Sequence, residues 1–516
     1  MANKRRLSPV RVILAVLILA GIFYFGSKNI RRWEEERIIM STRDPWFASY
    51  VDVTAKPQYP FEQNANLENQ GNVVLAFIVS SSEDACTPSW GNYYSLDEAN
   101  DELDLDRRIA RLRQLGGSVA VSFGGQLNDE LAINCKDFNK LKEAYKSIID
   151  RYDIDTIDFD IEGEGLSNPD AIKRRAKVIA DLQKEFRSND KNLAVWLTLP
   201  VTPQGLTESG TNAVASMLSN GIDLSGVNIM TMDYGESRQA DQTMQYASER
   251  ALIETHRQLG ILYDQAHISL SDTALWAKLG ATPMIGQNDI LGEIFTLDDA
   301  KGFNEFTLAK GLTRMSMWSA NRDIKCGDNY VNITVVSDSC SGIKQEQFDF
   351  ANTLGQGFSG DISSNSSTIT IESPKTKTVT DDPAKSPYQI WTENGTYLEG
   401  TKVVWHQNVY QAKWWTKGDI PDNPVLQAYQ TPWQLVGPVL PGEKPIPQPT
   451  LPLGTYPVWD GTVIYDAGER VLFNNVPYEA EWWTQGDSPA AATSNPDSSP
   501  WITLTKEQIE RIIEKK

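Results

Sequence analysis

The densest group of residues that could do chemistry is the stretch DTIDFDIEGEG at positions 155 to 165. Asp158, Asp160 and Glu162 alternate there with bulky apolar residues. On a β-strand, alternate side chains share a face, so these three carboxylates lie together roughly 6 to 7 Å apart, and the apolar residues face the other side. Like charge and partial burial together raise the pKa of at least one such group, which suits it to donate a proton.

Glu162 stands at the end of this run, nearest to any open cleft, and is our candidate general acid. A calcium site is the alternative, because Asp-x-Asp-x-Glu-Gly resembles the beginning of an EF-hand loop. That loop needs a Glu at its twelfth position, where this chain has Pro169, and the intervening Phe159 and Ile161 fit a buried strand. The sequence therefore favours an acid–base site.

The elements that must position these acids alternate between strand-like and helix-like stretches over residues 44–352. Eight apolar, β-branched runs are strand candidates: 47–53, 72–79, 118–123, 154–161, 193–199, 226–232, 281–286 and 312–318. Between several of them lie stretches with apolar residues at helical spacing, such as DAIKRRAKVIADLQKEF. This α/β pattern predicts a (β/α)8 TIM barrel, whose chemistry lies at the carboxyl ends of the strands.

The acidic stretch resembles the signature of family 18 glycoside hydrolases, Asp-Gly-x-Asp-x-Asp-x-Glu. Asp155, Asp158, Asp160 and Glu162 fill its acidic positions, and Thr156 replaces the Gly. The likeness implies a chitinase-type barrel enzyme.

Further motifs follow in the order that this family has. The segment SFGG at 122–125 resembles its third-strand motif, MTMD at 230–233 its sixth-strand motif, and Trp318 the tryptophan that forms the floor of the sugar site. Met232 stands where the family has a catalytic Tyr, and we expect Tyr234 to supply that hydroxyl. The expected substrate-binding residues are Ser122, Gly124, Met230, Gln287 and Trp318.

The resemblance also implies a mechanism in which the substrate supplies the nucleophile. Glu162 would protonate the glycosidic oxygen, and the sugar's own acetamido carbonyl would attack the anomeric carbon. Asp160 would hold the acetamido N–H, and Asp158 would share a proton with Asp160. Asp233 and Tyr234 would orient the acetamido oxygen. No metal and no cofactor are expected.

The C-terminal part contains an internal repeat with a period of 68 residues. Tyr388, Trp391, Tyr397, Val403, Tyr410, Trp414, Trp415, Gly418, Asp419, Pro432 and Trp433 recur as Tyr456, Trp459, Tyr465, Val471, Tyr478, Trp482, Trp483, Gly486, Asp487, Pro500 and Trp501. A period without insertions indicates a duplicated module. Each copy is too small for a large core, so some of its many aromatic residues are expected to form a binding surface.

Two adjacent tryptophans mark each copy. Neighbouring strand residues face opposite sides, so we expect one of each pair to pack inward and the other to face solvent; burial of both is the alternative. The repeat resembles the chitin-binding modules of carbohydrate-binding families 5 and 12 in its Ala-x-Trp-Trp-Thr-x-Gly-Asp core. The implied chitin-binding residues are Trp391, Tyr410, Trp414 and Trp415, with Trp459, Tyr478, Trp482 and Trp483.

The N-terminus has basic residues before a short apolar run, Val12 to Gly26, which is typical of an export signal. We expect an uncleaved signal-anchor rather than a cleaved peptide, and an extracellular protein that is secreted or tethered to the outer face of the membrane. Export permits disulfides, and proximity in sequence favours Cys86–Cys135 and Cys326–Cys340. A net charge of −20 argues against nucleic acid as a partner.

These observations predict a chitinase that acts on N-acetylglucosamine polymers and oligosaccharides, expected to be a monomer. The alternatives are an endo-β-N-acetylglucosaminidase on other glycans and a catalytically inactive chitin-binding surface protein. The expected domains are an export segment at 1–43, a barrel at 44–352, a linker at 353–385, a module at 386–436, a Pro-rich linker at 437–455, a second module at 456–505 and a tail at 506–516.

Overall fold

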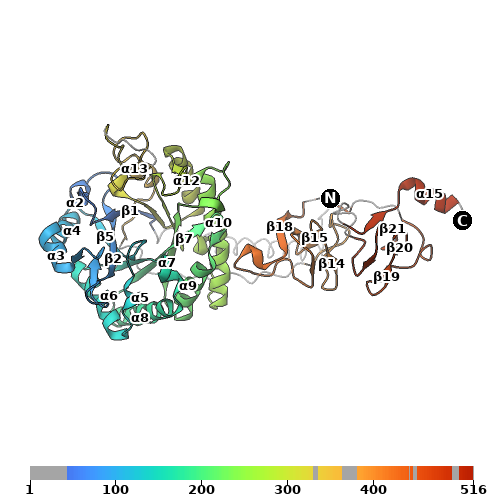
Figure 1. Cartoon of the computed structure of the whole chain (residues 1–516), viewed down its shortest axis with the longest axis horizontal. Coiled ribbons are helices and arrows are strands. Elements are labelled where there is room, and N and C mark those ends of the chain that lie inside the picture. Colours follow the sequence, from blue (N-terminus) through green and yellow to red (C-terminus); the bar gives the residue numbers. More distant parts are fainter. Residues whose placement is uncertain are drawn as a thin grey trace, which may run out of the picture. The chain divides into compact units, whose positions relative to one another are not determined.

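The computed structural model describes residues 44–328, 335–362, 380–440, 442–445, 450–490 and 499–514. The chain divides into two compact units, Met1–Ser373 and Pro374–Lys516 (Figure 1). The predicted export segment lies outside the described residues. Within the described part, no helix is both long and apolar enough to cross a membrane.

The first unit is a closed barrel of parallel strands, which confirms the predicted fold. In the described residues its strands are β1 (Trp46–Asp52), β2 (Asn72–Ser80), β5 (Ser118–Gly124), β6 (Thr156–Asp160), β7 (Ala194–Thr202), β9 (Leu224–Thr231), β10 (Leu279–Pro283) and β13 (Arg314–Met317). They pair in that circular order, and β1 closes the barrel by pairing with both β2 and β13. Each of the predicted strand runs corresponds to one of them.

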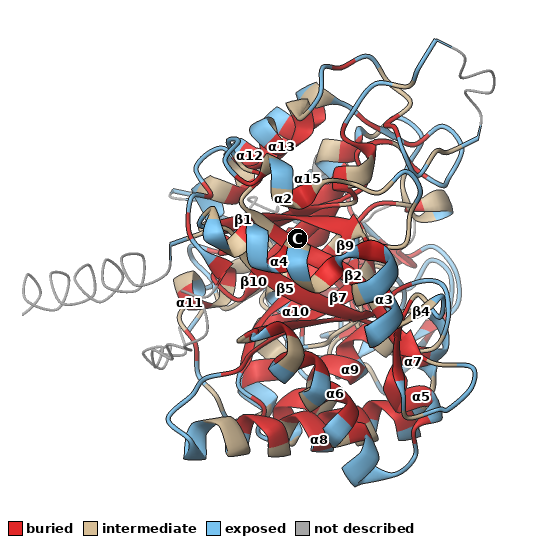
Figure 2. Cartoon of the chain, turned by 90° about the vertical axis from the view of Figure 1, so that its left-hand side faces the viewer, coloured by how far each residue is buried: buried red, intermediate tan, exposed pale blue. Residues whose placement is uncertain are grey.

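Helices surround this barrel, and the strands form its buried centre (Figure 2). The longer ones are α3 (Leu96–Leu103), α4 (Leu105–Gln114), α6 (Phe138–Tyr152), α8 (Pro169–Ser188), α9 (Glu208–Ser219), α10 (Met244–Gln265) and α12 (Leu297–Lys310). Local sequence sets their ends: at α8 the Asn168 side chain accepts the N–H of Ala171 at 3.1 Å, and Pro169 occupies the first turn.

The barrel continues beyond residue 352, where the sequence placed its end. Helix α13 (Asp349–Leu354) follows, and Ile362 then packs in the same core cluster as Trp46 and Trp196. Disulfides join Cys86 to Cys135 and Cys326 to Cys340, which confirms both predicted pairings.

The second unit holds the two copies of the repeat, and their strands follow the same period. The first copy has β14 (Thr396–Tyr397), β15 (Lys402–Trp405), β16 (Asn408–Ala412), β17 (Thr416–Lys417) and β18 (Trp433–Pro438). The second has β19 (Ile464–Tyr465), β20 (Arg470–Phe473), β21 (Val476–Ala480), β22 (Thr484–Gln485) and β23 (Trp501–Thr503). Corresponding strands pair identically in the two copies.

A hydrogen bond from a buried tryptophan holds each copy in the same way. The indole N–H of Trp433 donates to the carbonyl of Asp419 at 2.8 Å, and that of Trp501 donates to Asp487 at 2.8 Å. The predicted C-terminal tail is instead helix α15 (Lys506–Glu514), whose Ile509 is buried against the second copy.

Candidate active site

Strand β6 carries the acids at the carboxyl end of the barrel. Asp158 and Asp160 are buried inside the barrel, and Glu162 follows the strand as the residue that precedes helix α7 (Gly163–Ser167). Phe159 points the other way and stacks on Phe123 with ring centres 5.2 Å apart. The predicted alternation of faces therefore holds, and the acids share the inner face.

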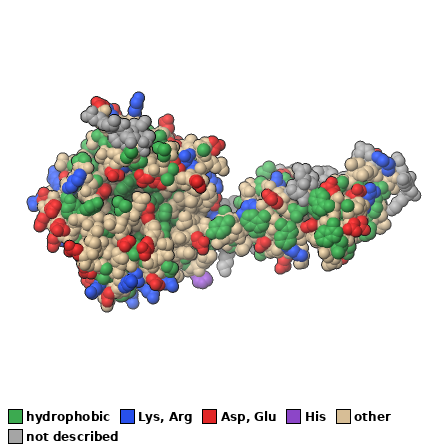
Figure 3. Space-filling view, viewed as in Figure 1, with side chains coloured by type: hydrophobic (Ala, Val, Ile, Leu, Met, Phe, Trp, Pro, Cys, Tyr) green, Lys and Arg blue, Asp and Glu red, His purple; other side chains and the backbone are tan. Residues whose placement is uncertain are grey.

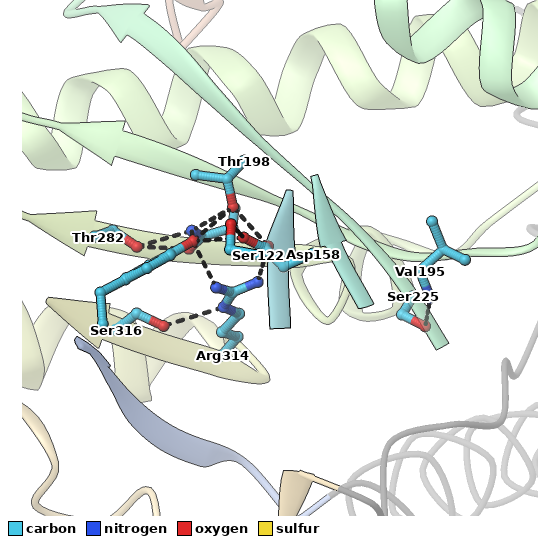
Figure 4. Close-up of polar contacts among 10 residues, drawn as sticks. Ser122, Asp158, Val195, Thr198, Ser225, Thr282, Arg314 and Ser316 are labelled. Carbon is cyan, nitrogen blue, oxygen red and sulfur yellow. Dashed lines mark hydrogen bonds and ion pairs between the residues drawn. The ribbon is translucent and has the colours of Figure 1, made fainter. Parts of the chain in front are cut away.

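Asp158 is bound by side chains from four other strands (Figure 4). Tyr50 of β1 and Ser122 of β5 donate to its Oδ2 at 2.8 and 2.7 Å. Thr198 of β7 and Arg314 of β13 donate to its Oδ1 at 2.7 and 2.6 Å. Asp158 is therefore a fully hydrogen-bonded carboxylate, paired with a buried cation.

Asp160 stands in contrast to Asp158. Its Oδ1 is buried and has no hydrogen-bond partner among the described residues. Burial raises the pKa of Asp160 well above its usual value, Glu162 and Asp158 add to the rise, and Arg314 opposes it. Asp160 thus binds a proton tightly and keeps a free oxygen for a ligand.

Glu162 has the protonation behaviour that a general acid needs. Burial raises the pKa of Glu162 to about 7, and the carboxylates of Asp233 and Asp289 contribute to the shift. A carboxyl that titrates near neutral pH can give and take back a proton during a reaction cycle. The electrostatics support the role predicted for Glu162.

Asp233 lies just after the end of β9 and lines the same cavity as Glu162. Its Oδ1 accepts the N–H of Ile290 at 3.0 Å, and its own N–H donates to Asn288 at 3.3 Å. Burial raises the pKa of Asp233 to about 6. The loop at 288–290 therefore fixes a third proton-binding carboxyl in the cavity that Glu162 lines.

The acids open into a cavity with one apolar side. Asp160, Glu162, Asp233 and Asp289 line it together with Tyr50, Phe77, Met230, Met232, Met284 and Trp318. The Trp318 ring stacks on Phe77, with ring centres 5.5 Å apart and planes 19° apart. A flat aromatic floor below carboxyl groups can bind the apolar face of a sugar ring while the acids reach its polar groups.

The other predicted substrate-binding residues have different positions. Met230 lines the cavity, and Gly124 lines a smaller pocket beside Asp160 and Glu162. Ser122 is not among the residues that line the cavity, and its hydroxyl donates to Asp158. Gln287 lies in strand β11 (Gly286–Gln287), outside the residues that line the cavity, and its N–H donates to Ser341 at 2.8 Å.

Tyr234 does not reach the cavity, so the role that the sequence suggested for it is wrong in this geometry. Its hydroxyl is buried and bonds Ser248 of helix α10 at 3.1 Å. The physical reason is the backbone at Asp233, whose φ of 50° ends the alternation of side chains expected from a strand. Met232 occupies the cavity wall instead.

Sequence reasoning missed Tyr50 and Arg314, two principal partners of Asp158. They lie 108 and 156 residues from it along the chain. Both fall in runs that were recognised as strands, and an Arg inside an otherwise apolar run was an available signal.

Within the described residues, no three acidic, His or Cys side chains group as metal ligands.

In the second unit, both tryptophans of each pair are exposed. Trp414 and Trp415 are 44% and 57% exposed, and Trp482 and Trp483 are 47% and 59% exposed. The expected inward member does not exist, because each pair lies in a connection between short strands where alternation does not apply. Figure 3 shows hydrophobic side chains gathered on the surface of this unit.

The remaining aromatic residues assigned to binding in the two copies are core residues instead. Trp391 and Tyr410 pack in the first hydrophobic cluster, and Tyr478 in the second, with Trp459 partly buried against it. Of the aromatic residues assigned to binding, the exposed ones are thus the tryptophan pair of each copy.

The sequence profile of Glycosyl hydrolases family 18 matches residues 47–408, and the chain belongs to this family. Carbohydrate-binding module family 5/12 matches residues 458–501, in the second copy. The solved structures include the catalytic domain of a hyperthermophilic chitinase from Pyrococcus furiosus, which is 26% identical with a TM-score of 0.53. The alignment covers 62% of this chain and 97% of that one.

Two relatives match more than half of this chain. The probable bifunctional chitinase/lysozyme of Escherichia coli (strain K12) is 33% identical over 307 residues, which are 58% of this chain and 33% of that protein. Endochitinase 11 of Metarhizium anisopliae is 33% identical over 336 residues, which are 59% of this chain and 62% of that protein. The chain thus matches one third of the first relative and about three fifths of the second.

Proposed function

We propose that this chain is a chitinase that hydrolyses β-1,4-linked N-acetylglucosamine polymers with retention of configuration. The observation that carries the proposal is the pair of proton-binding carboxyls, Asp160 and Glu162, on the inner face above Trp318. The two relatives and the Pyrococcus furiosus enzyme, which are named as chitinases or endochitinases, support the substrate.

The proposed reaction uses the substrate's acetamido group as nucleophile. Glu162 gives its proton to the glycosidic oxygen while the acetamido carbonyl oxygen bonds to the anomeric carbon, and the bond to the leaving sugar breaks. Asp160 accepts the acetamido N–H on its free oxygen and stabilises the positive oxazolinium. Glu162 then takes a proton from the water that opens this ring, which restores both the enzyme and the configuration. Asp233, which the sequence assigned to this role together with Tyr234, orients the acetamido oxygen alone.

Both C-terminal copies act as chitin-binding modules in this proposal. The matching strand register and the exposed pairs Trp414–Trp415 and Trp482–Trp483 support the assignment of the first copy along with the second. Two linked modules bind a repetitive surface more tightly than one, because the second binding event is intramolecular. Action outside the cell, after export through residues 1–43, completes the proposal.

The test is incubation with colloidal chitin and with fully deacetylated chitosan, read by the mass of the products. We expect N-acetylglucosamine oligosaccharides from chitin and none from chitosan, since the deacetylated polymer lacks the nucleophile. A thiazoline analogue of the oxazolinium should inhibit. Rapid cleavage of fully deacetylated polymer would exclude the substrate-assisted mechanism, and inert chitin would exclude the function.

A further inference from the structure

The Asp158 carboxylate has no acceptor position left for a proton shared with Asp160. A carboxylate offers about four lone-pair sites, and Tyr50, Ser122, Thr198 and Arg314 donate to all of them. We propose that Arg314 is a positioning residue that holds Asp158 as a fixed anion, so that the single proton of the Asp158–Asp160 pair stays on Asp160. This proposal rests on the chitinase function proposed above.

Arg314 cannot easily leave this position. Its Nε donates to Ser316 at 3.0 Å and its Nη2 to the Tyr50 hydroxyl at 2.9 Å, while Nη1 binds Asp158. The guanidinium also lies 5.2 Å from the ring centres of both Trp46 and Trp196. A planar cation with fixed donors on its edge and aromatic rings beside it keeps one orientation.

The charged and titratable groups that face the pair come from few elements. Among the described residues, Tyr50 faces the pair from β1 and Arg314 faces it from β13. Glu162 follows β6, the strand that carries the pair itself. The other partners, Ser122 and Thr198, are neutral. Arg314 is therefore the cation that offsets the charge of the buried pair, and its removal would leave that charge uncompensated.

Asp158 and Asp160 therefore have different roles in the reaction. Asp160 carries the proton and presents an oxygen to the acetamido N–H, and Asp158 carries the negative charge. That charge lies roughly 6 to 7 Å down the strand from Asp160, where it attracts the positive oxazolinium through the buried interior of the barrel. Loss of the charge by uptake of a second proton would lower the rate.

The experiment is the pH profile of kcat on a soluble N-acetylglucosamine oligosaccharide for the wild type, Arg314→Met and Arg314→Lys. Without the cation, the pair takes up its second proton at higher pH. We expect Arg314→Met to lower kcat and to move the acid limb upward by about one pH unit or more. Lys keeps the charge, so Arg314→Lys should keep the acid limb. The alkaline limb should stay in both variants, because Asp233 and Asp289 are the charges that act on Glu162.

The chain offers a matched control in a second buried ion pair, Arg175 with Glu130 at 2.8 Å. Arg175→Met should cost similar stability and leave the acid limb in place. If Arg314→Met does not fold, Tyr50→Phe removes another donor from Asp158 and should move the acid limb upward by less. An unmoved acid limb in these folded variants, or an equal shift in Arg175→Met, would overturn the proposal. A wild type that leaves the oligosaccharide intact would instead overturn the chitinase function.

Discussion

The barrel site and the two C-terminal copies differ in what they hide and what they expose. At the barrel mouth, carboxyl groups are buried, and burial raises their pKa values. In the copies, large aromatic side chains remain in solvent at strand connections. Proton transfer needs desolvated groups in fixed places, whereas binding a flat polymer surface needs exposed apolar area. The two regions should therefore respond independently to mutation and to pH.

The largest expected effect is the loss of rate in Glu162→Gln. Gln fills the same space and has no acidic proton to give, so kcat on soluble oligosaccharide should fall by about 10²- to 10⁴-fold. Binding to insoluble chitin, measured by co-sedimentation, should stay at the wild-type level. A variant that keeps a tenth of the wild-type rate would remove Glu162 from this role.

Replacing the four exposed tryptophans, Trp414, Trp415, Trp482 and Trp483, with Ala should reverse that pattern. Affinity for insoluble chitin should fall by about 10²-fold or more, because the advantage of two linked sites is lost with the stacking area. Cleavage of soluble oligosaccharides should change less than about twofold. Replacing one pair and then the other would show whether the copies contribute equally, and an equal loss on both substrates would mean that they support the barrel's fold.

The barrel site and the C-terminal copies should also differ in how they depend on pH, with a smaller expected effect than that of the substitutions above. The acid form of Glu162 is lost as pH rises through its pKa of about 7, so kcat should fall about tenfold per pH unit above that value. Tryptophan does not titrate, so binding of a fragment that spans residues 374–516 should stay constant from about pH 5 to 9. A plateau of kcat up to pH 9 would contradict the raised pKa.

The smallest effect concerns stability. The pKa of Glu162 rises from 4.5 in the unfolded chain to about 7 in the folded one. The contribution of its proton to stability is therefore fully present below about pH 4.5 and is lost as pH rises through 7. Glu162→Gln should therefore raise the free energy of unfolding at pH 8 by on the order of 2 kcal/mol. Urea unfolding at pH 8 and pH 4.5 measures this, and the gain should vanish at the lower pH.

The sequence predicted the elements well because their signals are local. Alternation of β-branched runs with amphipathic stretches located every barrel strand, and an exact period located the copies. Side-chain direction was predictable within β6, where Asp158 and Asp160 do share a face. The prediction of side-chain direction failed at Tyr234 and at the tryptophan pairs, because these residues lie where regular strand geometry has ended.

The partners of Asp158 could not be read from the sequence for another reason. Tyr50 and Arg314 reach it only because the first and last barrel strands pair with each other, with Trp46 opposite Arg314. Register between strands so far apart is set by closure of the whole barrel, and sequence patterns that cover ten or twenty residues do not contain it.

Closure through β1 and β13 also fixes the order of events when the chain is made. Strand β13 emerges from the ribosome long after β1, roughly tens of seconds later at about 5 to 20 residues per second. Until then, β1 and β10 each present an unpaired edge that can pair with another nascent chain. The ion pair between Arg314 and Asp158 therefore forms only after the last barrel strand has been made, and a chain cut short before Arg314 is an aggregation hazard rather than a weaker enzyme.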